Sequence, residues 1–218
     1  MKAAVAIVED HPMFRERLAE LINKERDLQV CGEADNIRDG FTLIMERGAQ
    51  VAIIDLTLQN SNGLELLKNL KAAGSNVPVL VLSMHDEALY AERALRAGAR
   101  GYITKNQASA NVMTALRQVL AGEIYLGTKA ATKILTNISG AGVQRRTGVE
   151  RLTDRELEVF EMIGHGQATR EIGVRLNLSS PTVETYRARI KEKLQLENAA
   201  QLQREAVRWV QAHEVASV

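Results

Sequence analysis

The chain has 218 residues, of which 45% are hydrophobic and 25% are charged, and its formal net charge is +1. These proportions are close to those of average globular proteins and exclude a wholly disordered or collagen-like chain. The sequence holds no apolar run near the ~20 residues of a membrane-spanning helix, and Glu9 and Asp10 interrupt the N-terminus before a signal-peptide pattern develops. Because the single cysteine, Cys31, cannot form an internal disulfide, we expect a cytoplasmic protein with no membrane association.

Charge is divided unevenly along the chain. Residues 1–126 carry 14 basic and 16 acidic side chains, whereas residues 127–218 carry 14 basic and 11 acidic ones. The two parts therefore have net charges of −2 and +3. A polyanion such as a nucleic acid is expected to bind the second part.

Residues 1–122 alternate short β-like runs with segments of helical period. Strands are expected at Ala3–Val8, Leu28–Glu33, Val51–Ile54, Val77–Leu82 and Gly101–Ile103. Helices are expected from Pro12, over Ile37–Arg47, Gly63–Ala73 and Glu87–Ala97, and along the apolar stripe Val112, Leu116, Val119 and Leu120. The alternation predicts an α/β domain with a doubly wound, five-stranded parallel sheet.

The regular pattern weakens over residues 123–150, which predicts a linker that contains a short helix. From residue 151 to 213 the pattern is helical throughout. Thr153 and Glu156 form a capping box that opens a helix ending near Gly164. Further helices are expected at Thr169–Leu176, from the cap Ser179 to about Gln195, and at Ala199–His213. The second domain is therefore predicted to be a small all-α domain of four helices.

Charged and polar residues follow the predicted strands. Glu9 and Asp10 follow the first strand, Asp55 ends the third, Ser83 ends the fourth and Lys105 lies beyond the fifth. Alone, each could be an ordinary strand-end residue, but ligands of doubly wound sheets bind at these carboxyl ends. Three converging carboxylates repel one another unless a hard cation such as Mg²⁺ joins them. A carboxylate beside Mg²⁺ can attack phosphorus while a lysine offsets the developing charge, so the pattern predicts an aspartyl phosphate.

The same residues resemble those of a known family. The series Glu9-Asp10, Asp55, Ser83, Tyr102 and Lys105 is similar in order and spacing to the receiver domain of two-component response regulators. The resemblance implies a flavodoxin-like fold and a histidine kinase as the partner that phosphorylates Asp55.

The resemblance also assigns roles to single residues. It implies that Glu9, Asp10, Asp55 and the backbone carbonyl of Thr57 hold Mg²⁺. It further implies that Ser83 and Lys105 bind the phosphoryl oxygens while Tyr102 turns inward as an aromatic switch. The sequence departs from the family at Leu58-Gln59, where a Met-Pro pair is usual, and at Asn106, where proline often follows the lysine.

In the second domain, two helices joined by a short turn indicate a helix-turn-helix whose second helix enters the major groove of DNA. Val183, Ile190 and Leu194 would pack inward, which turns Glu184, Thr185 and Ala188 outward where base edges are read. Basic residues of such a face are often merely solvated, but here they could reach phosphates. The predicted DNA-contacting residues are Thr182, Glu184, Thr185, Arg187, Ala188, Arg189, Lys191 and Lys193.

This domain also resembles a known module. From about Arg151 to Val210 the sequence is similar to the LuxR-type DNA-binding domain. The residues that carry the similarity are the run LTDRELEV at 152–159, Gly166, Glu171-Ile172, Leu176, Ser179, Thr182-Val183 and Lys193-Leu194. Together the two resemblances point to the NarL/FixJ subfamily, which implies binding of half-sites in double-stranded DNA as a dimer. Glu184 departs from the usual lysine, and Ala168 from the usual serine cap. Glu184 could accept a hydrogen bond from a cytosine amino group or pair with a neighbouring arginine.

These patterns favour a phosphorylation-activated transcription regulator in which phosphorylation shifts the domain arrangement or promotes a homodimer. We do not expect an enzyme beyond slow self-dephosphorylation. A phosphatase of the dehalogenase type usually has a second acid two residues after its nucleophile, where this chain has Thr57. The remaining alternative is a DNA-binding regulator that is independent of phosphorylation and carries a vestigial receiver.

Overall fold

The computed structural model describes residues 2–58, 61–85, 87–138 and 148–214. The chain divides into two compact units, residues 1–138 and 139–218, each of which is described by itself. Among the described residues, no helix combines the length and the apolar character that crossing a membrane requires. The domain limits expected at residues 122 and 151 stay predictions.

The first unit is built on a parallel sheet, as predicted. Its five strands are β1 (Ala3–Val8), β2 (Leu28–Ala34), β3 (Val51–Asp55), β6 (Val79–Ser83) and β7 (Gly101–Thr104), in the order β2-β1-β3-β6-β7. Its helices are α1 (Pro12–Lys24), α2 (Ile37–Glu46), α3 (Gly63–Ala72), α4 (Glu87–Ala97), α5 (Lys105–Leu120) and α6 (Thr128–Ile138). The order reverses at β1, which makes the sheet doubly wound and flavodoxin-like.

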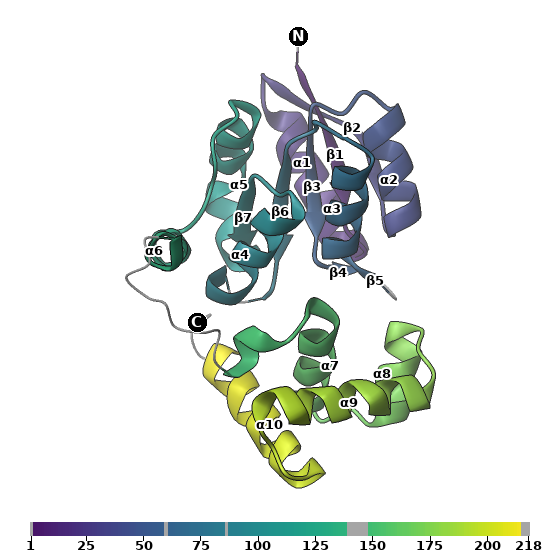
Figure 1. Cartoon of the computed structure of the whole chain (residues 1–218). Helices are drawn as coiled ribbons and strands as arrows, with labels where there is room; N and C mark the ends of the chain where they lie inside the picture. The colour runs from purple at the N-terminus through teal and green to yellow at the C-terminus, as the bar shows by residue number, and fades with distance from the viewer. Residues whose placement is uncertain (1, 59–60, 86, 139–147, 215–218) are drawn as a thin grey trace. The chain divides into compact units, whose positions relative to one another are not determined.

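Helices cover both faces of this sheet (Figure 1), so the central strands β3 and β6 are buried along their whole length and apolar up to their last residue. On one face, α1 and α5 pack against inward side chains of the sheet, with Ile22, Ile53 and Leu116 at the centre of this core. On the other face lie α2, α3 and α4. The buried core extends to the carboxyl ends of the strands, which gives the residues just beyond them a rigid base.

A short hairpin follows β3 and was not predicted. It consists of β4 (Thr57–Leu58) and β5 (Ser61–Asn62), which pair antiparallel, while Gln59 lies outside the described residues. Asn62 caps α3 by accepting a hydrogen bond from the backbone N–H of Leu64 (2.8 Å). A Cβ atom on Gly63 would collide with the backbone oxygen of Asp55, so only glycine lets α3 begin this close to the end of β3.

The segment after α5 belongs to the first unit. Tyr125 continues the sheet edge beside β7, because the N–H of Tyr102 donates to its carbonyl oxygen (2.9 Å) and its own N–H donates to Arg100 (3.0 Å). The Glu87 carboxylate accepts a hydrogen bond from the N–H of Gly127 (2.5 Å), and α6 packs against α4. The short helix expected within 123–150 is thus α6; residues 139–147 lie outside the described residues.

The second unit has the four predicted helices after a 3-10 turn, η1 (Gly148–Arg151). They are α7 (Asp154–Gly164), α8 (Thr169–Leu176), α9 (Ser180–Leu194) and α10 (Ala199–Glu214). The capping box of Thr153 and Glu156 is present, Asn177 ends α8 in the left-handed conformation (φ 52°), and Ser179 caps α9. Its core includes Val159, Phe160, Ile163, Ile172, Leu176, Val183, Ile190 and Leu202, whereas Leu194, predicted to pack inward, is half-buried.

Candidate functional site

The carboxyl ends of the strands bring the predicted charged residues together. Asp55 is the last residue of β3 and only 1% exposed, and Lys105, the first residue of α5, places its Nζ 2.8 Å from Asp55 Oδ2. The same Nζ lies 2.9 Å from Glu9 Oε1 and 2.7 Å from Oε2. It also lies 4.7 Å from the centre of the Phe14 ring, a cation–π contact. Lys105 therefore holds a fixed positive charge between two buried carboxylates.

The pKa values reflect this crowding. Burial, followed by the negative charge of Glu9, raises the pKa of Asp55, although Lys105 and a hydrogen bond from the Thr57 N–H (3.1 Å) act in the opposite direction. Burial alone would lower the pKa of Lys105, but Asp55 and Glu9 outweigh it and raise that pKa above its ordinary value. Burial and the neighbouring carboxylate therefore outweigh the stabilisation that Lys105 gives to charged Asp55.

The pocket fits a hard cation. Within the described residues, Glu9 Oε2 and Asp10 Oδ1 are buried without a hydrogen bond, although a cationic or ring nitrogen lies near each. Possible ligand atoms of Glu9, Asp10, His11 and Asp55 lie within 4.8 Å of one another. Carboxylate oxygens without hydrogen bonds are ligands that Mg²⁺ prefers, and a bound divalent cation would offset the crowded negative charge. The acidic residues expected to bind a metal are thus brought together.

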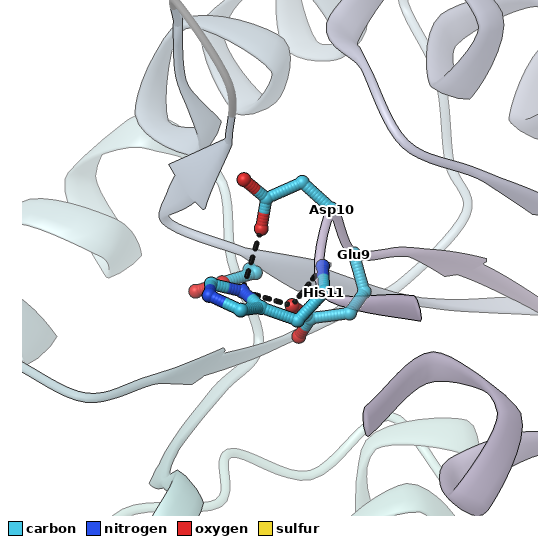
Figure 2. A group of neighbouring side chains, drawn as sticks. Glu9, Asp10 and His11 are labelled. Carbon is cyan, nitrogen blue, oxygen red and sulfur yellow. Dashed lines mark hydrogen bonds and ion pairs between the residues drawn. The ribbon is translucent and has the colours of Figure 1, made fainter. Parts of the chain in front are cut away.

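His11 is a member of this group that the sequence reasoning missed. Its Nδ1 lies 2.8 Å from Asp10 Oδ1 and 3.1 Å from Glu9 Oε1, as Figure 2 shows, while the side chain is 65% exposed. The signal for it was available, since His11 directly follows the acidic pair at the end of β1.

A hydrogen-bond network joins the pocket to β7. Ser83, at the end of β6, is fully buried, and its Oγ accepts from the backbone N–H of His85 (3.1 Å). The Tyr102 hydroxyl donates to the carbonyl oxygen of His85 (2.9 Å), and its side chain is buried. His85 Nε2 also lies 3.0 Å from Thr57 Oγ1, and its ring stacks on Tyr90 at 4.5 Å. The sequence analysis did not single out His85, although it contacts Ser83 at the end of β6, Thr57 just after β3 and Tyr102 in β7.

The predicted DNA-contacting residues of α9 fall into two groups. Glu184, Thr185 and Ala188 are exposed, as their outward spacing predicts, and Arg189 is exposed as well. Thr182, Arg187, Lys191 and Lys193 are half-buried. Thr182 contacts the cap Ser179 through their hydroxyls (2.7 Å), the Arg187 side chain is only 15% exposed, and Lys193 binds Glu156 (2.6 Å). Arg187 and Lys193 therefore already serve contacts within the second unit.

Glu184 has partners inside the domain. Its Oε1 accepts a hydrogen bond from the hydroxyl of Thr169 on α8 (2.6 Å), and the Nε of Arg187 lies 3.7 Å away. Pairing with a neighbouring arginine was one of the two expectations for this residue. The hydroxyl of Thr169 is a second partner, which the sequence did not indicate.

Both units match family models. Residues 5–117 match the response regulator receiver domain, and residues 150–206 match the bacterial regulatory proteins of the luxR family. This chain belongs to the two-component response regulators. Its combination of a receiver domain and a LuxR-type helix-turn-helix domain is that of the NarL/FixJ subfamily, as the sequence predicts.

Similar response regulators align along almost the whole chain. The transcriptional regulatory protein UhpA of Salmonella typhimurium is 36% identical over 91% of this chain and 94% of its own length. The virulence regulator BvgA of Bordetella pertussis, named as a putative positive transcription regulator, is 30% identical over 91% and 93%. A solved structure of the RcsB response regulator from Salmonella typhimurium shares the fold, with a TM-score of 0.69 and 23% identity over 95% of this chain and 98% of that one.

The family membership bears on whether the protein is a metabolic phosphatase. The relatives are transcription regulators, which speaks against a metabolic phosphatase. Family membership does not by itself assign a role to any single side chain. The roles of Asp55, Lys105, Ser83 and Tyr102, and the metal contact of the Thr57 carbonyl, stay predictions.

Proposed function

We propose that this response regulator is a DNA-binding transcription regulator of the cytoplasm that is activated by phosphorylation of Asp55. The observation that carries the proposal is the placement of Asp55, which is buried at the end of β3 with a lysine ammonium group 2.8 Å away and two further carboxylates beside it. Burying and crowding a carboxylate in this way costs folding free energy, and groups in such surroundings are typical of functional sites.

Phosphorylation would proceed by in-line transfer. One oxygen of the Asp55 carboxylate forms a bond to phosphorus while the bond between phosphorus and the histidine nitrogen of the kinase breaks. Glu9, Asp10, Asp55 and the carbonyl of Thr57 would hold Mg²⁺, which supplies positive charge to the transferring phosphoryl group. Lys105 remains beside Asp55 and offsets charge on the phosphoryl oxygens. Any later hydrolysis is a slow reset of the regulator and not the turnover of an enzyme.

The network around His85 offers a route for the signal. The Oγ of Ser83 accepts a hydrogen bond from the N–H of His85, so a phosphoryl group that takes the Ser83 hydroxyl as a donor would be connected through this side chain to the β6–α4 loop. Tyr102 is bonded to the same loop and, through its backbone, to Tyr125. A charge change at Asp55 would therefore bias the position of the loop, of α4 and of the segment after α5.

The second unit would bind double-stranded DNA through α9. Thr185, Ala188 and Arg189 are exposed on this helix, as a base-reading and phosphate-binding face requires. The relatives UhpA and BvgA are transcription regulators by name, and RcsB has been solved with promoter DNA and as dimers on DNA. Phosphorylation that favours a homodimer would present two half-site readers together and raise the effective affinity.

The first test is a phosphorylation assay on the full chain. We expect incubation with a small phosphodonor and Mg²⁺ to add one phosphoryl group to the intact mass, and Asp55→Asn to abolish the gain, since an amide is a poor nucleophile. Asp35→Asn is the matched control, because it makes the same change at an exposed carboxylate outside the acidic group. An undiminished adduct in Asp55→Asn would exclude Asp55 as the acceptor.

The same samples are then sized and titrated with promoter-length DNA. A phosphorylation-dependent shift to dimer and tighter DNA binding would support the complete proposal. DNA binding that is equal in the wild type and in Asp55→Asn, with and without phosphodonor, would favour the alternative of a vestigial receiver.

A further inference from the structure

We propose that Glu184 is a specificity-determining residue that reads the 4-amino group of a cytosine in the major groove. The inference rests on the proposed function, because it requires that α9 lies against base edges. Glu184 lies near the start of α9 on its exposed side and its side chain is 60% exposed. Its neighbours on this side, Thr185 and Ala188, are small and uncharged. They leave a longer side chain room to approach a base.

The carboxylate of Glu184 is fixed from two helices. The hydroxyl of Thr169, at the start of α8, donates to Oε1 at 2.6 Å, and Nε of Arg187 lies 3.7 Å from the same oxygen. Arg187 is itself largely covered by the domain. In the part of the chain that the structure describes, Oε2 takes no hydrogen bond. One oxygen thus anchors the group in a defined position, while the other stays available to a ligand.

An available carboxylate oxygen discriminates between bases because it accepts hydrogen bonds and donates none. In the major groove guanine presents two acceptors, thymine presents an acceptor and a methyl group, and adenine places an acceptor beside its amino group. Cytosine presents an amino donor without a neighbouring acceptor. Glu184 therefore gains a hydrogen bond at cytosine and meets repulsion at guanine and thymine, while at adenine the N7 acceptor offsets the hydrogen bond from the amino group. Rejection of the wrong partner is itself a source of specificity.

Thr169 is then a positioning residue. It acts through Glu184, since it holds Oε1 and so sets where Oε2 points. Removing its hydroxyl should weaken the cytosine preference without removing the charge of Glu184. A serine at this position keeps the hydroxyl and should keep the preference.

The test is selection from a pool of random DNA duplexes with the full chain, phosphodonor and Mg²⁺. Wild type is compared with Glu184→Ala, Thr169→Val and the control Thr169→Ser, each checked for an unchanged unfolding midpoint. We expect a C·G pair in the wild-type motif that Glu184→Ala no longer selects and Thr169→Val selects weakly. All other positions of the motif should be retained, and Thr169→Ser should match wild type.

The amino group is then tested directly. Replacing that cytosine by 2-pyrimidinone, which lacks the 4-amino group, should weaken wild-type binding roughly tenfold, as the loss of one base contact does. The same replacement should leave Glu184→Ala binding unchanged. A cytosine elsewhere in the motif serves as the control position.

The outcomes separate the two levels of the proposal. If Glu184→Ala selects the wild-type motif at every position, Glu184 reads no base and the inference is wrong, while DNA binding stands. If wild type enriches no motif and binds the final pool no better than the starting pool, sequence-specific DNA binding itself is contradicted.

Discussion

Glu156 is a buried carboxylate whose contacts connect the start of α7 to the end of α9. Its Oε2 accepts hydrogen bonds from the Thr153 N–H (2.7 Å) and from Lys193 Nζ (2.6 Å). Burial would raise the pKa of Glu156, but these partners outweigh it and lower the pKa below its ordinary value of 4.5. The charged form of Glu156 therefore stabilises the folded second unit.

Glu156→Gln should lower the free energy of unfolding of the second unit by about 1–2 kcal/mol, because Lys193 loses its anionic partner. Since the folded pKa is lowered, this contribution is present above the ordinary pKa and is lost as the pH falls through 4.5 and below. Urea unfolding at neutral and acidic pH, followed by tryptophan fluorescence, measures it. Glu192→Gln, on the exposed side of α9, is the control and should change little. Equal stability losses for both variants would contradict the role of Glu156.

At the scale of elements, a hydrogen bond from the Gly127 N–H to the Glu87 carboxylate (2.5 Å) links the start of α6 to α4. Glu87→Ala removes the acceptor, so we expect amide exchange at Gly127 to accelerate by roughly fivefold, equivalent to about 1 kcal/mol. Glu92→Ala is the matched control, because Glu92 pairs with Arg96 on α4 itself. Hydrogen-exchange mass spectrometry resolves the two cases, and equal protection of Gly127 in both variants would mean that this bond does not hold α6.

The elements themselves could be predicted because their signals are repeated along the chain. The apolar runs predict the strands, and Thr153, Ser179 and Pro12 mark helix starts where the helical apolar period begins. Because these independent signals point to the same elements, the sheet and the helix-turn-helix follow from the sequence. The hairpin of β4 and β5 was missed because two-residue strands carry no period.

Single contacts were harder to predict than elements. Arg187 and Lys193 share a helix with the exposed Arg189, yet long side chains can fold back onto their own domain, and spacing along a helix does not reveal this. The convergence of Glu9, Asp10 and Asp55 was predictable because strand ends converge by topology. His85 was not, because its contacts arise from loop geometry that no short motif encodes.

At the scale of the whole molecule, each unit has its own core. The single tryptophan, Trp209, lies in the second unit, where its ring meets that of Phe160 in an edge arrangement (5.9 Å between ring centres), so its fluorescence follows the unfolding of that unit. We expect Mg²⁺ at about 100 times its dissociation constant to stabilise the first unit by roughly 2.7 kcal/mol. Calorimetry should show this stabilisation as a higher unfolding temperature of the first unit, while the unfolding midpoint of the second unit, measured by tryptophan fluorescence, stays constant. Asp10→Asn should reduce the Mg²⁺-dependent stabilisation of the first unit. If Mg²⁺ raised the unfolding midpoint measured by Trp209 fluorescence by the same amount, the cation would not bind specifically in the first unit.

The bridge that Tyr125 adds to the edge of β7 also bears on how this receiver can be reused in engineered proteins. A chimaera that attaches a different output domain after Gly122 would delete the backbone partner of Tyr102 and the N–H that Glu87 binds. The sheet edge would then be open to pairing with another chain. A junction after Ile138 keeps both contacts, so the graft point itself decides whether the transplanted receiver retains its native edge.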